Sequence, residues 1–166
     1  MWFPSRKPKP STVQNPSPTR VEQLFEEVTR VVAFDFNVMM VVEDNRIRIP
    51  ALDSRGPDIA IVAEGQRITL TIGPWYDDFQ STDLIVEYVR WALNGTLRVR
   101  VDRMRERPVC VALELRFPDG SWQEDCAMKF GIPLFRRQAI ETFYLQNALR
   151  ADLGTISPAA ARAAAN

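Results

Sequence analysis

The chain of 166 residues contains no histidine. Histidine is the side chain most used for general acid-base catalysis near neutral pH, and its imidazole is a common zinc ligand. Its absence excludes sites in which histidine activates a serine, cysteine or threonine nucleophile, and zinc sites that need an imidazole. We therefore predict a non-enzymatic protein with no cofactor and no metal.

Glycine is scarce as well, with seven residues that fall mostly in expected turns. The chain has no glycine-rich phosphate loop, no GxSxG nucleophile turn and no HExxH motif. A nucleotide-binding role is not expected.

There are two cysteines, Cys110 and Cys126, and they do not form a CxxC motif. The strand register predicted below places them on opposite faces of a hairpin, which is poor geometry for a disulfide. We predict two free thiols in a reducing compartment.

Charge is balanced, because 21 Lys and Arg residues face 21 Asp and Glu residues. This balance does not favour nucleic acid or an anionic membrane as partner. The chain start has no signal-peptide pattern, and no apolar run approaches the roughly 18 residues of a membrane span. We expect a cytoplasmic, bacterial protein.

Composition divides the chain into three parts. Residues 1–17 are rich in proline and basic residues and are predicted to be disordered, and residues 154–166 form an alanine-rich tail. Residues 18–153 are predicted to form a single domain, since 46% hydrophobic and 25% charged residues are typical of a chain with one core.

The hydrophobic periodicity predicts an α+β fold. Antiparallel sheets of about seven strands follow the order α-ββ-ββ-α-βββ-α, with the helices packed on one face. The elements expected are a helix from Thr19 to before Asn37, hairpins in 40–49 and 59–72, a helix over 82–94, strands near 97–101, 109–117 and 122–130, and a helix over 133–152.

Two registers follow from the turns. A type II′ turn at Gly65-Gln66 pairs residues 63 with 68, 61 with 70 and 59 with 72, which places the apolar side chains on one face. Pairing 117 with 122 across the second hairpin also pairs 113 with 126 and 111 with 128.

Three aromatic and two acidic residues lie together before the second helix, in a predicted loop formed by Trp75, Tyr76, Asp77, Asp78 and Phe79. In one interpretation the acids complement the helix N-terminus and the rings enter the core. In the other the segment is a partner-binding surface for a basic protein, and we take it as the candidate site. A metal site built from these acids and Asp83 is not supported, because no second acidic cluster is visible.

The basic run predicts a secondary basic face made of Arg98, Arg100 and Arg116. Arg98 and Arg100 alternate with valines and lie within cross-strand reach of Glu114, which favours a solvated, ion-paired face. The alternative, a phosphate-binding ridge, needs an aromatic platform on the same face, and none is predicted there.

The segment from Ile68 to Phe79, the following helix and the strand after Gly95 resemble a pattern in small immunity-type proteins of bacterial polymorphic toxin systems. Trp75 and Phe79 match that pattern, whereas Tyr76 and Asp78 stand where it tends to carry histidines. The resemblance covers about 35 residues and implies an inhibitor that binds a toxin domain, with the 75–79 segment as contact. The order of elements is also similar to type III secretion chaperone-like domains, which usually dimerise.

The leading hypothesis is a protein-binding module, an immunity-type inhibitor whose partner is another protein such as a basic toxin domain. A chaperone-like homodimer is the second hypothesis. The third is a small enzyme that uses the carboxylates of Asp77 and Asp78 alone.

Overall fold

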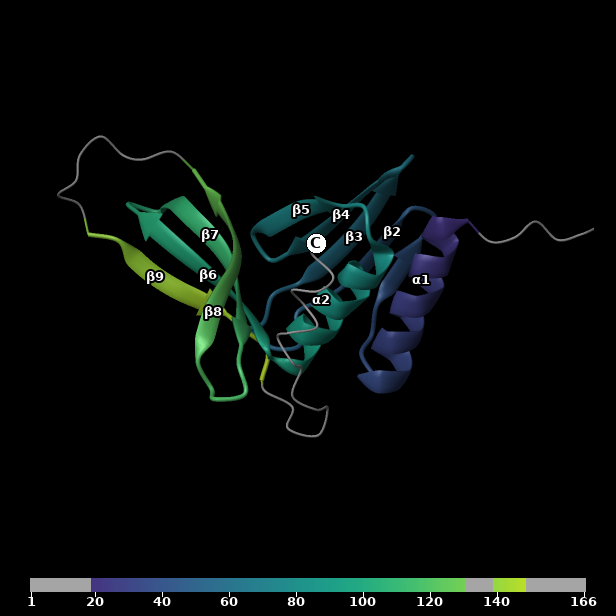
Figure 1. The fold of residues 1–166 in the computed structure, drawn as a ribbon, viewed down its shortest axis with the longest axis horizontal. Coiled ribbons are helices and arrows are strands. Elements are labelled where there is room, and N and C mark those ends of the chain that lie inside the picture. The colour runs from purple at the N-terminus through teal and green to yellow at the C-terminus, as the bar shows by residue number, and fades with distance from the viewer. Residues whose placement is uncertain (1–18, 131–138, 149–166) are drawn as a thin grey trace, which may run out of the picture.

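The computed structural model describes residues 19–130 and 139–148 (Figure 1). The predicted tails 1–17 and 154–166 lie outside the described residues. The first part of the chain contains α1 (Arg20–Arg30), η1 (Val31–Asp35), β1 (Val41–Glu43), β2 (Arg46–Ile49), β3 (Ile59–Glu64), β4 (Arg67–Ile72) and β5 (Trp75–Phe79). The second contains α2 (Thr82–Asn94), β6 (Leu97–Met104), β7 (Arg107–Arg116), β8 (Trp122–Lys129) and β9 (Glu141–Leu145).

The strands form two antiparallel sheets, so the α+β class is confirmed. Sheet A has the order β1-β2-β3-β4-β5, and sheet B has the order β8-β7-β6-β9. The described residues thus contain nine strands where the sequence pattern predicted about seven. The two additional strands are β5, which was predicted to be a loop, and β9, which was predicted to be helical.

The first helix begins where the cap pattern predicts. Thr19 accepts a hydrogen bond from the backbone N–H of Glu22, and the Glu22 side chain accepts one from the backbone N–H of Thr19. This capping box satisfies amide groups that the first helical turn leaves unpaired. Val31–Asp35 then continues as a π-helical turn, and Asn37, with φ of 52°, ends the helical segment.

The register of the β3–β4 hairpin is confirmed at every predicted pair. Ile59 lies opposite Ile72, Ile61 opposite Leu70, and Ala63 opposite Ile68. Gly65 has φ of 63°, a left-handed conformation that favours glycine at the first turn position. The earlier hairpin of β1 and β2 also forms, with Val42 opposite Ile47.

The predicted register of β7 and β8 is right in one half and wrong in the other. Val111 pairs with Met128 and Leu113 with Cys126, but an irregularity follows, and Arg116 instead of Phe117 pairs with Trp122. The extra residue is Asp125, so the bulge turns Trp122 to the face opposite Cys126. Both cysteines are free thiols, as predicted.

The helix predicted over 133–152 is wrong where the structure describes it. Glu141–Leu145 is a strand that pairs antiparallel with β6, with Phe143 opposite Val101 and Leu145 opposite Val99. Residues 131–138 and 149–152 lie outside the described residues.

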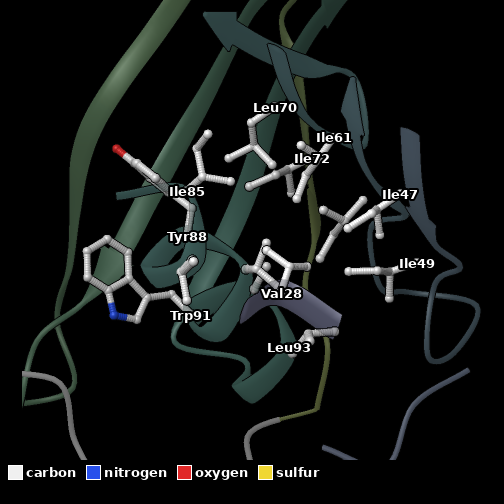
Figure 2. Close-up of a cluster of buried hydrophobic side chains, with 14 of the residues drawn as sticks. Val28, Ile47, Ile49, Ile61, Leu70, Ile72, Ile85, Tyr88, Trp91 and Leu93 are labelled. Atoms are coloured by element: carbon white, nitrogen blue, oxygen red, sulfur yellow. The ribbon is translucent and has the colours of Figure 1, made fainter. Parts of the chain in front are cut away.

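The core lies between the inner face of sheet A and the two helices, and it continues to sheet B (Figure 2). Helix α2 runs through it, as its few polar positions predicted, and ends at Gly95 with φ of 78°. Side chains from α1, both sheets and α2 contribute to one cluster, which includes Val28, Ile47, Ile61, Leu70, Ile85, Leu93, Val99 and Leu113.

Candidate functional site

The predicted binding segment 75–79 is the edge strand β5. It pairs with β4, with Trp75 opposite Ile72, Tyr76 opposite Thr71 and Asp78 opposite Thr69. Because strand side chains alternate, the five residues are divided between two faces of sheet A. Trp75, Asp77 and Phe79 share the inner face, and Tyr76 and Asp78 share the outer face.

On the inner face, Trp75 is a core residue with 1% of its surface exposed. Its ring lies 6.0 Å from Tyr88 of α2 and 6.3 Å from half-buried Phe79, and Tyr88 also contacts Trp91 at 5.3 Å. Edge-to-face aromatic contacts of this kind add to the apolar burial. The structure therefore assigns Trp75 to the packing between β5 and α2.

On the outer face, Tyr76 is 56% exposed, and the Asp78 carboxylate has two partners. Arg67 forms an ion pair with it at 2.5 Å, and the Thr69 hydroxyl donates a hydrogen bond at 2.7 Å. The hydrogen bonds from Arg67 and Thr69 hold the pKa of Asp78 below its usual value. Asp78 is thus a fixed negative charge beside an exposed aromatic ring.

Asp77 is exposed as well, but it lies on the inner face of β5, on the side of Cys126 in β8. Burial, followed by the negative charge of Asp125, raises the pKa of the Cys126 thiol to about 12, and Asp77 adds to that effect. The Tyr88 hydroxyl donates a hydrogen bond to Asp125, and burial together with this bond raises the pKa of Tyr88. Asp77 and Asp78 therefore lie on opposite faces of β5.

The outer face around Tyr76 extends across all of sheet A. One cross-strand row runs Val41, Arg48, Ala60, Thr71, Tyr76, and the next runs Glu43, Arg46, Val62, Thr69, Asp78. None of these ten residues is buried, so no described element covers this face. Its centre is small and uncharged, with arginines on the β2 side and Tyr76 with Asp78 on the β5 side. We call these ten residues the outer face of sheet A.

A hollow of about 990 Å³ adjoins the C-terminal end of β5, at Asp78 and Phe79. It lies between the start of α1, the β3–β4 turn and the end of β5, and Arg20, Gln66, Arg67 and Asp78 line it together with Phe79. Asp77 does not line it, so the hollow does not bring the two predicted carboxylates together.

The predicted basic face is ion-paired, as the sequence indicated, but it is less solvated than expected. Glu114, 5% exposed, accepts hydrogen bonds from Arg98 at 2.7 Å and from Arg100 at 2.6 Å. Arg100 also binds Glu124 at 2.9 Å and lies 3.4 Å from Asp102. Burial opposes the charge of Arg100, but the hydrogen bonds with Glu124 and Glu114 raise its pKa on balance.

The prediction that this face lacks an aromatic platform is wrong. The Arg98 guanidinium lies 4.2 Å from the ring centre of Trp122 and 4.0 Å from that of Tyr144. Trp122 reaches the face because of the bulge in β8, and Tyr144 does so because residues 141–145 form a strand. Both rings are engaged by Arg98, whose charge Glu114 already balances.

Several residues that shape these surfaces were not predicted. Arg67 and Thr69 hold Asp78, and the pair Tyr88 and Asp125 links α2 to β8. The alternation of Thr69 and Thr71 with buried residues could have indicated the uncovered face of β4. The Tyr88 contact could not have been predicted, because it depends on the bulge at Asp125.

Among residues 19–130 and 139–148, no group of three or more acidic or cysteine side chains is arranged to hold a metal ion. None of the helices in this part of the chain is long and apolar enough to cross a membrane. Comparison of the chain with protein-family models, curated proteins and solved structures finds no match.

Proposed function

We propose that this chain is a non-enzymatic protein-binding module and that it contacts a basic protein through the outer face of sheet A, at the end formed by Tyr76 and Asp78. The observation that carries the proposal is the packing of sheet A. Both helices lie against its inner face, and its outer face presents an uncharged centre beside an exposed tyrosine and a fixed carboxylate.

The chemistry of this end of the face is typical of a protein interface. Tyrosine supplies a large contact area with little loss of conformational entropy, and it is enriched among residues that dominate binding energy. Asp78 is held by Arg67 and Thr69 in one position, so it can meet a cationic side chain without first being ordered. A basic toxin domain, as the resemblance to immunity-type proteins implies, is a partner of this kind.

The division of Asp77 and Asp78 between two faces does not favour an enzyme that uses both carboxylates. General acid-base catalysis by a pair requires that both groups reach the same substrate. The hollow beside the end of β5 is lined by Asp78 and not by Asp77, whereas a small substrate would need both groups in one pocket.

The test uses the purified products of the genes adjacent to the one that encodes this chain, with binding measured by titration calorimetry. Tyr76→Ala should weaken binding about 30-fold, as expected for a residue that contributes roughly 2 kcal/mol. Asp78→Ala should weaken it in a way that diminishes at high salt.

Asp77→Ala is the matched control, because it removes the same charge from the adjacent residue on the opposite face. It should change the affinity by less than about threefold. Equal affinities of the wild type and the Tyr76→Ala/Asp78→Ala double variant for a bound product would contradict the proposal.

A further inference from the structure

Exposed apolar side chains are concentrated in the segment that leads into β1. Eight large hydrophobic side chains are exposed among the described residues, and four of them fall within residues 34–42. These four are Phe34 at 82%, Met39 at 83%, Val41 at 55% and Val42 at 51%. Isolated exposed apolar residues need no explanation, but two of these four belong to the edge strand β1.

The strand in this segment has an open edge. β1 pairs with β2 on one side, and no described strand lies on the other. Natural proteins protect edge strands by keeping them short, by placing charges or proline on them, or with a bulge or an inward-pointing charge. β1 is short, with three residues, and carries one charge, Glu43. Val41–Glu43 contains no proline, pairs with β2 without a register shift, and has valine at the position that faces inward.

The turn of the first hairpin determines which backbone groups point to that edge. Asp44 and Asn45 form a two-residue turn, and Glu43 pairs with Arg46 directly beside it. Such a turn closes on a pair that exchanges both hydrogen bonds, and the next pair along the strands does not. The N–H and C=O of Val42 therefore point away from β2 toward the open edge.

We propose that two copies of this chain associate through β1, antiparallel, about a twofold axis at Val42. Val42 of one copy and Val42 of the other exchange both of their free backbone hydrogen bonds. Sheet A of each copy then continues into the other, which gives one sheet with five strands from each copy.

The side chains of β1 are complementary to themselves in this register. On the inner face, Val42 of one copy lies opposite Val42 of the other, and both are next to Ile47 of their own β2. The two Val42 side chains, each half-exposed in the monomer, then cover each other. On the outer face, Val41 lies opposite Glu43 of the second copy, which also brings that carboxylate toward Arg48. No like charges lie opposite each other, and like charges in that position would destabilise the pairing.

This interface is separate from the Tyr76 and Asp78 surface, because β1 and β5 are opposite edges of sheet A. Dimerisation through β1 therefore does not require the proposed function. In such a dimer the Tyr76 and Asp78 ends of both copies stay uncovered and lie on one continuous sheet. A partner with two equivalent sites would then bind more tightly than its single-site affinity implies.

The experiment is light scattering after size exclusion, with wild-type protein at up to about 1 mM, which detects even a millimolar dissociation constant. The wild type should approach twice the chain mass of 19.0 kDa as concentration rises. Val42→Lys should remain at 19.0 kDa, because it places two lysines directly opposite each other.

Val41→Lys is the matched control, since the same new charge would lie opposite Glu43 of the second copy. It should dimerise at least as well as the wild type. A wild type that stays monomeric over this range overturns the proposal, as does equal dissociation of the two lysine variants.

Cross-linking provides a second measurement that does not depend on tolerance of a lysine. Val42→Cys should form a disulfide-linked dimer under mild oxidation, because residues paired across antiparallel strands lie within disulfide reach. Val41→Cys should form at least tenfold less disulfide-linked dimer, because residue 41 of one copy does not lie opposite residue 41 of the other. Equal cross-linking of the two variants would show that the contact does not have this register.

Discussion

The outer faces of the two sheets differ in how their charged side chains are paired and buried. On sheet B, Arg98 and Arg100 share the buried Glu114 between them, and Trp122 and Tyr144 enclose Arg98. On sheet A the central residues are small and neutral, and the ion pair of Arg67 with Asp78 is exposed. One face buries and shares its charges, and the other leaves an ion pair and the Tyr76 ring exposed.

The difference shows that a run of charged residues in the sequence does not by itself indicate an exposed charged surface. The arginines of sheet B are the most basic run in the chain, but the carboxylates beside them balance their charge. The outer face of sheet A has an uncharged centre, and Arg67 and Thr69 hold the Asp78 carboxylate without covering it. The three predictions that follow test this comparison.

The largest effect is expected for Glu114→Gln. It would leave Arg98 and Arg100, which are 19% and 23% exposed, without their shared carboxylate. Removal of one partner from a fully buried ion pair costs 3–5 kcal/mol, so with this partial exposure we expect a loss of about 2–3 kcal/mol in urea unfolding.

The matched variant on sheet A is Asp78→Asn, which breaks the exposed pair with Arg67. Exposed ion pairs contribute little to stability, so the urea midpoint should stay close to that of the wild type. If Asp78→Asn proves as destabilising as Glu114→Gln, the two faces do not differ in the way described here.

The second effect concerns alkaline stability at the junction of the sheets. Because the pKa of Cys126 rises to about 12 on folding from a usual value of 9.0, the unfolded chain loses this proton first. The stabilisation that comes from the protonated Cys126 thiol is complete below pH 9. As the pH rises from 9 toward 12, the free energy of unfolding falls by about 1.4 kcal/mol per pH unit.

Urea unfolding of the wild type and Cys126→Ala at pH 8 and pH 10 measures this contribution. The wild type should lose about 1.4 kcal/mol more than the variant between these two values. Identical pH dependence in both proteins would show that the thiol is not shielded by folding. Cys110→Ala is the control, because it removes the other thiol, which lies on β7.

The smallest effect is expected for Arg98→Lys. Lysine keeps the charge but loses the planar group that binds Glu114 and stacks between Trp122 and Tyr144. We expect a loss of about 1 kcal/mol and faster amide exchange in β9. Arg116→Lys, on the neighbouring strand, should change neither quantity, and equal effects of both variants would contradict this role of the stack.

The sequence predicted sheet A well where turn chemistry and alternation agreed. Gly65 determined one hairpin, and the apolar alternation on both sides of it permitted a single register. β5 was missed because Asp77 stands on its inner face between Trp75 and Phe79, so the alternation of an amphipathic strand is interrupted. Tyr76 in the predicted binding segment is exposed, but the division of the segment between two faces could not be predicted.

Sheet B was harder to predict because long-range packing decides two of its features. Trp122 and Cys126 have the same parity, so the pattern placed them on one face, and only the bulge at Asp125 separates them. Ile140, Phe143 and Tyr144 fit helical spacing as well as a short strand does. The segment forms a strand and not a helix because it can pair with the open edge of β6, and the position of that edge depends on the whole fold.

The place of β9 beside β6 has a consequence for the order of folding. Every pairing within sheet A joins strands that are neighbours in the chain, whereas Thr142 reaches Asp102 across 40 residues. Contacts between distant segments close late, because the chain entropy of the loop must be lost first. We therefore expect a nascent chain to hold sheet A and the β6–β8 meander while the valine-rich edge of β6 still has no neighbour. Until β9 leaves the ribosome, that edge is the site at which a chaperone would protect this protein from aggregation.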